Sequence, residues 1–294
     1  MSMAWLRSAV MVSVLVVLAG VCSLRADAPK ENQWIVMQLA QGYQATDGVA
    51  ICPNDTVYFA DVPNGVIYRF NPASGRTAIY RRACGYSRRL QFDPNGKLYA
   101  CEFTTRQITC ADIDWKEPNK RDAVINLSRI NPNARPFDMA IDEHNGIYFT
   151  EYTAGDASDN GAWLYYATNN DDVAKLDTDI ARPSSLTLSP KHDRLYVCDD
   201  EARTIYAFPL DQPGKLGARQ QIATNLTERP DSMATDASGN LYVTGTTSVW
   251  VYSPQGELVE RIELPENPSS CVWSADGSTL YVTAGKSLYG LVRQ

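Results

Sequence analysis

A short pattern of polar and hydrophobic positions recurs along the chain. Each copy begins at an Asp, Asn or Gly turn and continues into an apolar residue, a tyrosine and a small or apolar residue, as in Asp55-Thr-Val-Tyr-Phe59. A polar turn followed by such a short run is typical of a β-strand. The copies lie at 55–59, 95–100, 145–149, 193–197, 239–243 and 276–282. Repetition at this spacing predicts an all-β protein, a β-propeller with six four-stranded blades around one channel.

The positions of the copies predict where each blade begins and ends. We expect blades at 44–82, 84–129, 134–179, 180–225, 227–265 and 266–294. The last blade is one strand short, because the chain ends soon after the run at 287–292. The β-like run Trp34–Leu39 has no blade of its own, and we expect it to complete the sixth blade and close the ring. No stretch sustains a helical period, so helix content should be very low.

The first 28 residues have the features of a secretory signal peptide. Arg7 supplies positive charge, an apolar run extends from Ala9 to Val21, and Ala26 and Ala28 offer small residues for cleavage. The run is short for a membrane span, so we expect it to be removed. The remaining residues, 29–294, contain no linker-like segment and predict one domain. We expect this domain in the periplasm or secreted, without membrane attachment.

Charge narrows the choice of partner. The chain carries 27 Lys and Arg against 34 Asp and Glu, and removal of residues 1–28 leaves a net charge of −8. An acidic protein without a basic stripe is a poor match for nucleic acid or an anionic membrane. We therefore expect a monomer that binds a small molecule.

Six cysteines remain after removal of the leader. Export makes disulfides possible, and Cys101 and Cys110 flank the turn at 104–107, so that they could face each other across a hairpin. None of the six has the Cys-x-x-Cys spacing of a zinc site. The other four are expected to be small buried residues on blade strands.

The two histidines and the repeated tyrosines suggest structure rather than chemistry. His144 and His192 lie in turns that should face away from the channel mouth and into solvent. With no other histidine, a Ser-His-Asp triad and a histidine zinc site both lack the residues they need. Because the tyrosine recurs at one position of every blade, we expect it to pack between neighbouring blades.

Several segments resemble the SMP-30/gluconolactonase/LRE-like propellers. They are Arg229-Pro-Asp-Ser-Met to Val243, the run from Pro268 to Tyr289, and the shorter stretches 92–102, 146–151 and 182–199. Together they cover essentially the whole exported chain. The resemblance implies a six-bladed propeller and a hydrolase acting on a sugar-acid lactone or a similar cyclic ester.

The resemblance also implies a site at the top of the channel. It implies a divalent metal, commonly calcium, with zinc or magnesium as alternatives, whose ligands correspond to Asp47, Ser184 and Asp231. Asp231 would also be the general base for attack by water. Asp138 corresponds to a residue that positions substrate, and Glu102 belongs to a matching Cys-Glu segment and is a further candidate for substrate binding.

The chain departs from the family pattern at several of these positions. Asp47 replaces a longer Glu, Ser184 and Phe137 replace Asn, and Ser232 replaces Gly. Two carboxylates still favour a cation, but a hydroxyl is a weak ligand and a phenyl ring is none. These departures leave a second hypothesis open, in which the propeller binds a small ligand or a protein without catalysis.

Arg88 adds an alternative to the metal. Its cation could point into the channel and offset Asp47, Asp138 or Asp231, in addition to its candidacy for substrate binding. In that case the arginine would replace the ion, and the metal would be absent.

Overall fold

The computed structural model describes residues 34–113, 116–153, 162–169 and 172–294. The predicted signal peptide and the segment 154–161 lie outside the described residues. Within them, the only helix is the 3-10 turn η1 (Leu127–Arg129), and none is long and apolar enough to cross a membrane. The all-β prediction is confirmed.

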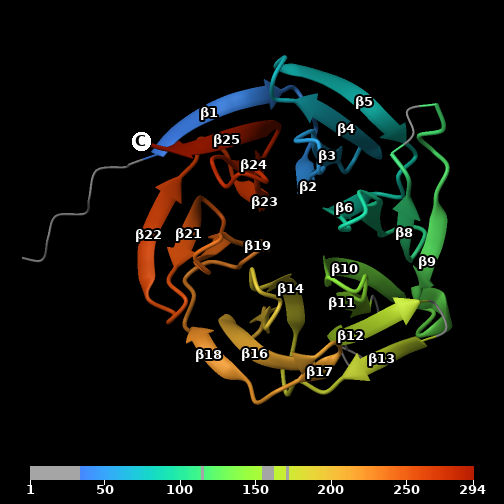
Figure 1. Cartoon of the computed structure of the whole chain (residues 1–294), viewed down its shortest axis with the longest axis vertical. Coiled ribbons are helices and arrows are strands. Elements are labelled where there is room, and N and C mark those ends of the chain that lie inside the picture. The colour runs from blue at the N-terminus through green and yellow to red at the C-terminus, as the bar shows by residue number, and fades with distance from the viewer. Residues whose placement is uncertain (1–33, 114–115, 154–161, 170–171) are drawn as a thin grey trace, which may run out of the picture. The chain divides into compact units, whose positions relative to one another are not determined.

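Six antiparallel sheets surround a central channel, as Figure 1 shows. Each follows the chain from its innermost strand outwards, and neighbouring innermost strands contact each other around the complete ring. Blade 1 contains β2 (Thr46–Ile51), β3 (Val57–Asp61), β4 (Val66–Asn71) and β5 (Arg76–Arg82). Blade 2 contains β6 (Ser87–Phe92), β7 (Leu98–Glu102), β8 (Gln107–Ala111) and β9 (Asp122–Asn126). Blade 3 contains β10 (Ala134–Ile141), β11 (Ile147–Thr153), β12 (Ala162–Asn169) and β13 (Asp172–Leu176).

The other three blades also start from an innermost strand, but blade 4 has five strands and blade 6 ends with β1. Blade 4 contains β14 (Pro183–Leu188), β15 (Arg194–Asp199), β16 (Thr204–Gln212), the two-residue β17 (Lys215–Leu216) and β18 (Gln220–Ala223). Blade 5 contains β19 (Ser232–Thr235), β20 (Leu241–Thr244), β21 (Ser248–Tyr252) and β22 (Leu258–Glu263). Blade 6 contains β23 (Pro268–Trp273), β24 (Leu280–Ala284), β25 (Ser287–Arg293) and β1 (Trp34–Gln41). The predicted six blades are confirmed.

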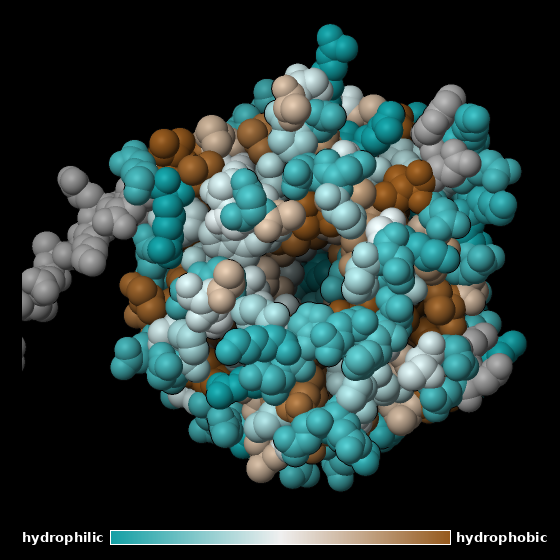
Figure 2. Space-filling view, viewed as in Figure 1, coloured by the Kyte–Doolittle hydropathy of each residue, from teal (hydrophilic) through white to brown (hydrophobic). Residues whose placement is uncertain are grey.

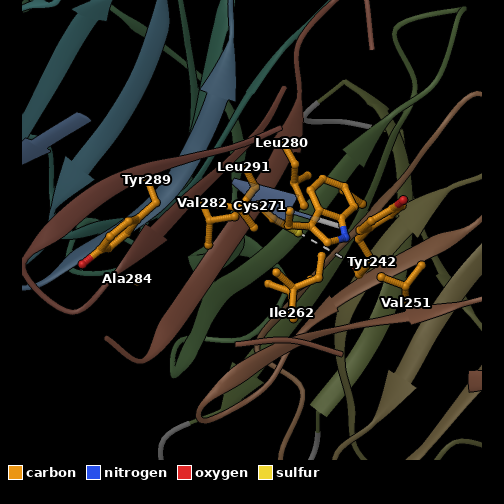
Figure 3. Close-up of a cluster of buried hydrophobic side chains, with 12 residues drawn as sticks. Tyr242, Val251, Ile262, Cys271, Leu280, Val282, Ala284, Tyr289 and Leu291 are labelled. Atoms are coloured by element: carbon orange, nitrogen blue, oxygen red, sulfur yellow. Dashed lines mark hydrogen bonds between the residues drawn. The ribbon is translucent and has the colours of Figure 1, made fainter. Parts of the chain in front are cut away.

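The first described strand completes the last blade. β1 pairs antiparallel with β25, from Trp34 opposite Arg293 to Gln41 opposite Ser287. Trp34 is buried, and its ring centroid lies 6.3 Å from that of Tyr242 and 6.2 Å from that of Trp273. The predicted closure of the ring is confirmed, and Figure 3 shows the buried cluster around this junction.

The repeated tyrosines join the blades. Tyr58 of blade 1 packs on Phe92 of blade 2 at 5.2 Å between ring centroids, and Tyr242 of blade 5 packs on Trp273 of blade 6 at 5.0 Å. Tyr281 of blade 6 lies in one cluster with Val49 of blade 1. These contacts confirm a packing role, since each ring covers the face of the next sheet.

The suggested pairing of Cys101 with Cys110 is wrong. The β7–β8 hairpin closes at the pair Glu102 and Gln107, and this register sets Cys101 opposite Ile108 and Cys110 opposite Tyr99. All six cysteines in the described part of the chain are free thiols. Burial raises the pKa of Cys101 well above its usual value, which keeps this thiol protonated.

Candidate functional site

The innermost strands carry an irregularity at one end of the channel. In β6, Ser87 pairs with Glu102 whereas Leu90 pairs with Ala100, so that Arg88 and Arg89 together face a single residue of β7. The same one-residue shift occurs in β2, β10, β14 and β23. A bulge re-aims the side chains next to it. Two consecutive residues of each of these five strands therefore contribute to this end of the channel, which we call the mouth. In blade 5, Asp231 directly precedes β19 at the same end.

In every blade the repeated tyrosine pairs with one residue of the innermost strand. When the six innermost strands are aligned at that residue, the residues three and two positions before it form two rings around the channel. The mouth ring is Asp47, Arg88, Phe137, Ser184, Asp231 and Ser269, and the second ring is Gly48, Arg89, Asp138, Ser185, Ser232 and Ser270. The predicted residues Asp47, Arg88, Ser184 and Asp231 share the mouth ring. Asp138 lies one ring deeper.

Arg89 of the second ring is the centre of the site. Its Nη1 donates to Asp47 Oδ1 at 2.6 Å and its Nη2 to Asp231 Oδ1 at 3.1 Å, while its Nε lies 3.5 Å from Asp138 Oδ1. Nη2 also donates to the backbone carbonyl of Asp231. Only 5% of the side chain is exposed. One buried guanidinium thus binds carboxylates from blades 1, 3 and 5.

Small residues occupy four positions of the second ring. Blade 1 contributes Gly48, and three other blades contribute serines. Gly48 has a φ of +56°, and a Cβ there would lie 2.6 Å from the carbonyl oxygen of Arg88. Glycine is therefore required for both the left-handed backbone and the close approach of the β6 backbone.

Charge and burial oppose each other at this centre. Burial disfavours the charge on Arg89, yet Asp47, Asp138 and Asp231 together raise its pKa, so the guanidinium stays protonated. Burial raises the pKa of Asp47 to about 6, although Arg89 opposes this. Burial also raises the pKa of Asp138, while Arg89 and a 2.9 Å hydrogen bond from Ser185 Oγ favour its ionised form.

Arg88 contacts one of the three carboxylates that it was predicted to offset, Asp47. Its side chain is 38% exposed, its Nε lies 3.4 Å from Asp47 Oδ2, and its guanidinium lies 5.7 Å from the ring centroid of Phe137. Its neighbour Arg89 makes the buried contacts instead. The sequence analysis missed Arg89 because regular alternation directs only one of two adjacent arginines inwards, and the bulge breaks that alternation.

The remaining predicted residues lie away from this centre. Ser184 Oγ donates to the carbonyl of Cys198 at 3.4 Å, and it is Ser185 that contacts Asp138. Glu102 is fully buried; it forms an ion pair with Arg121 and accepts hydrogen bonds from Thr105 and Thr109, both at 3.0 Å.

Glu102 ends β7, as Asp61 ends β3 and Asp199 ends β15, and these two carboxylates accept hydrogen bonds from the backbone N–H groups of nearby loops. The contacts of Glu102 therefore indicate loop anchoring. Substrate binding by Glu102 and metal binding by Ser184 remain predictions.

A cavity of about 330 Å³ extends along the channel below Arg89. Arg89, Asp138 and Ser232 line one end, and His192 and Trp273 line the other. The face drawn in Figure 2 is hollowed at the centre of the ring. His192 is not the solvated turn residue that the sequence predicted, because its Nδ1 is buried and makes no hydrogen bond.

The residues at the centre do not fit a divalent ion while Arg89 occupies this position. A hard cation needs several oxygen ligands around one point. Here one oxygen of each carboxylate faces the same guanidinium, so an ion would have to displace it. Across the described ranges, no group of three His, Cys, Asp or Glu side chains is arranged to hold a metal.

Comparison with known proteins identifies relatives over the whole ring. The family model described as the SMP-30/Gluconolactonase/LRE-like region matches residues 45–286. A gluconolactonase of Zymomonas mobilis is 24% identical over 302 residues, covering 90% of this chain and 83% of that protein. A gluconolactonase structure from Xanthomonas campestris superposes with a TM-score of 0.77 at 21% identity, covering 88% and 89% of the two chains. A calcium-binding regucalcin from Agrobacterium tumefaciens superposes with a TM-score of 0.73 at 17% identity, covering 89% and 96%.

Proposed function

The chain belongs to the SMP-30/gluconolactonase/LRE-like family, and we propose that it hydrolyses a sugar-acid lactone or a similar cyclic ester at the mouth of the channel. The relatives named gluconolactonase support this activity. The observation that carries the proposal is the position of Asp231. Its side chain is 33% exposed, whereas those of Asp47 and Asp138 are 6% exposed. Asp231 is therefore the carboxylate of this cluster that a small molecule at the mouth can approach.

Asp231 has the role of general base. It accepts a proton from a water molecule while the water oxygen bonds to the lactone carbonyl carbon. The ring C–O bond then breaks, and the leaving alkoxide takes the proton that Asp231 accepted, which gives the open hydroxy acid and regenerates the Asp231 carboxylate. The hydrogen bond from Arg89 Nη2 to Asp231 Oδ1 fixes the orientation of the carboxylate.

Arg88 and Phe137 complete the site in this proposal. Arg88 is half-exposed in the mouth ring, and its guanidinium would stabilise the oxyanion that develops on the carbonyl oxygen. The same group would bind the carboxylate of the product. Phe137 lies beneath Arg88 and offers an apolar surface to the substrate ring.

A divalent metal has no step in this mechanism. The resemblance implies such an ion, and a structural neighbour carries the name of a calcium-binding protein. Asp47 and Asp231, two of its predicted ligands, are instead bound to Arg89. We assign Asp47 and Asp138 to holding Arg89, with Asp138 acting on substrate only through it.

We also propose that the protein is exported and acts as a monomer. Residues 1–28 support passage to the periplasm or the exterior, where the lactone would be encountered. Fractionation of cells that express the full chain tests this location: the mature protein should lie outside the cytoplasm and begin near residue 27 or 29. Retention of the full-length chain in the cytoplasm would contradict export.

A binding module is the second candidate. The observation that favours it is the position of Arg89 among the three carboxylates, where its guanidinium offsets part of the negative charge that would otherwise attract an ion. In this case the mouth ring would bind a sugar-like molecule or a protein and leave it unchanged.

Hydrolysis assays with purified wild type and Asp231→Asn decide between the two. With a panel of aldonolactones, the wild type should open at least one faster than buffer alone, and Asp231→Asn should lower kcat by about 10²–10⁴-fold. Asp276→Asn, on an exposed turn between β23 and β24, is the control and should keep wild-type activity. Saturable lactone binding without turnover by the wild type would instead support the binding module.

A further inference from the structure

Arg89 joins blades that are far apart in the ring. It starts on β6 of blade 2, contacts Asp47 and Asp138 on the two flanking blades, and reaches Asp231 of blade 5 on the opposite side. Figure 1 shows β6 and β19 facing each other across the channel. The guanidinium therefore lies where the three carboxylates converge.

The carboxylates need a positive charge at this point. Asp47 and Asp138 are each 4% exposed, so water screens them little. Ionised carboxylates buried without a counter-charge are strongly destabilising. Arg88 meets part of this requirement from the surface, but its only carboxylate contact in the site is Asp47. Arg89 is the cation that all three share.

A guanidinium and a metal ion are mutually exclusive here. Arg89 uses Nη1, Nη2 and Nε toward one oxygen of each carboxylate, and Nη1 also donates to the carbonyl of Arg88 at 3.0 Å. Gly48 allows the backbone of β6 at Arg88 and Arg89 to approach β2 closely. Asp47 Oδ1 and Asp231 Oδ1 therefore already accept hydrogen bonds from Arg89, and Asp138 Oδ1 accepts one from the backbone N–H of Met139 at 2.8 Å.

We propose that Arg89 is an internal cation that takes the place of a divalent ion in this channel. The carboxylates of Asp47, Asp138 and Asp231 are not arranged to hold an ion while Arg89 lies among them, and they become able to bind one when Arg89 is removed. This assigns a specific role to a residue of the proposed active site. Ion binding is measured without substrate, so its outcome is independent of whether the chain hydrolyses lactones.

The test is thermal unfolding and calorimetric titration of chelator-treated protein with Ca²⁺, Mg²⁺ or Zn²⁺ alone. The wild type should show neither stoichiometric binding nor a raised midpoint. Arg89→Ala should bind one ion, and saturation should raise its midpoint by about 5 °C or more. Arg88→Ala, which removes the adjacent exposed guanidinium, should behave like the wild type.

A double variant identifies the ligands. Arg89→Ala combined with Asp138→Asn should lose most of the acquired ion affinity. The proposal is overturned if the wild type binds one ion and Asp231→Asn removes that binding. It is also overturned if Arg89→Ala folds and gains no affinity for any of the three ions.

Failure of Arg89→Ala to fold without metal does not end the test. Refolding of that variant only when an ion is present supports the proposal. Arg89→Lys keeps one positive charge in the channel, so it should fold without an ion. An Arg89→Lys protein whose folding requires a divalent ion would contradict the proposal.

Discussion

Nη2 of Arg89 lies 3.1 Å from Oδ1 of Asp231, a residue on the opposite side of the six-bladed ring. This contact, with those to Asp47 and Asp138, makes the centre of the channel a cluster of one buried guanidinium and three carboxylates. It orients the proposed general base, and it fills the position in which the family resemblance implies a metal.

Removal of Arg89 should destabilise the whole domain. Arg89→Met leaves Asp47 and Asp138 buried without their shared cation, and loss of one partner from a buried ion pair typically costs about 3–5 kcal/mol. Urea unfolding in the absence of divalent ions measures this loss. Arg88→Met is the control and should cost less than about 1 kcal/mol, because that guanidinium is partly exposed. Equal small losses in both variants would show that Arg89 does not stabilise the ring.

Gly48, within β2, should be much less replaceable than the turn glycine Gly65. Gly48 has a left-handed backbone with φ of +56°. In Gly48→Ala the added Cβ would also lie 2.6 Å from the carbonyl oxygen of Arg88. Gly65 has nearly the same φ, +61°, with nothing within 4 Å of an added Cβ. We expect Gly65→Ala to cost about 1 kcal/mol and Gly48→Ala about 2 kcal/mol more, measured as free energies of unfolding. Similar costs for the two would contradict the close approach of β2 and β6.

Glu151 should make stability depend on pH. Burial raises its pKa to about 7 from a usual value of 4.5, although Thr153 and Lys175 oppose the shift. The folded state therefore holds a proton that the unfolded state releases, and wild-type stability falls as pH rises from about 4.5 to 7. Glu151→Gln should remove this decline. It should exceed the wild type by up to about 3 kcal/mol above pH 7 and by little below pH 4.5.

Glu143, in the turn between β10 and β11, provides the control for this pH effect. Its side chain is 71% exposed, so Glu143→Gln should follow the wild-type profile at every pH. A Glu151→Gln profile parallel to that of the wild type would show that Glu151 titrates normally.

The strand that closes the ring should be essential for blade 6. Trp34 is 5% exposed and packs against rings of blades 5 and 6, whereas its neighbour Ile35 is 44% exposed. Trp34→Ala should cost about 3–5 kcal/mol and Ile35→Ala less than about 1 kcal/mol. Thermal unfolding of the two variants tests this contrast. A mild Trp34→Ala effect would mean that β1 contributes little to closure.

The repeat was sufficient to predict the fold. Its copies mark the second strand of every blade, and the orphan run at Trp34 could belong only to the incomplete last blade. The role of the repeated tyrosine was predictable for the same reason. A residue that recurs at one position of every blade is expected to pack between neighbouring blades. The register of the β7–β8 hairpin was not predictable from the sequence. A turn centred on residues 104–107 would set Cys101 opposite Cys110, but the hairpin closes at Glu102 and Gln107 instead.

The site was predictable only in part. Asp47, Asp138 and Asp231 could be named from the family resemblance, and they do meet at one guanidinium. Arg89 could not be distinguished from Arg88, because the choice depends on a bulge that alternation does not reveal. The available signal is Gly48, because a glycine within an inner strand indicates the close approach of a neighbouring backbone, here that of β6 at Arg88.

A crystal structure of the wild type grown with excess zinc, with an anomalous difference map at the zinc edge, tests the central claim most directly. The account predicts guanidinium density for Arg89 between Asp47, Asp138 and Asp231, and no anomalous peak there. An anomalous peak ligated by these carboxylates, with Arg89 displaced from the channel, would contradict it.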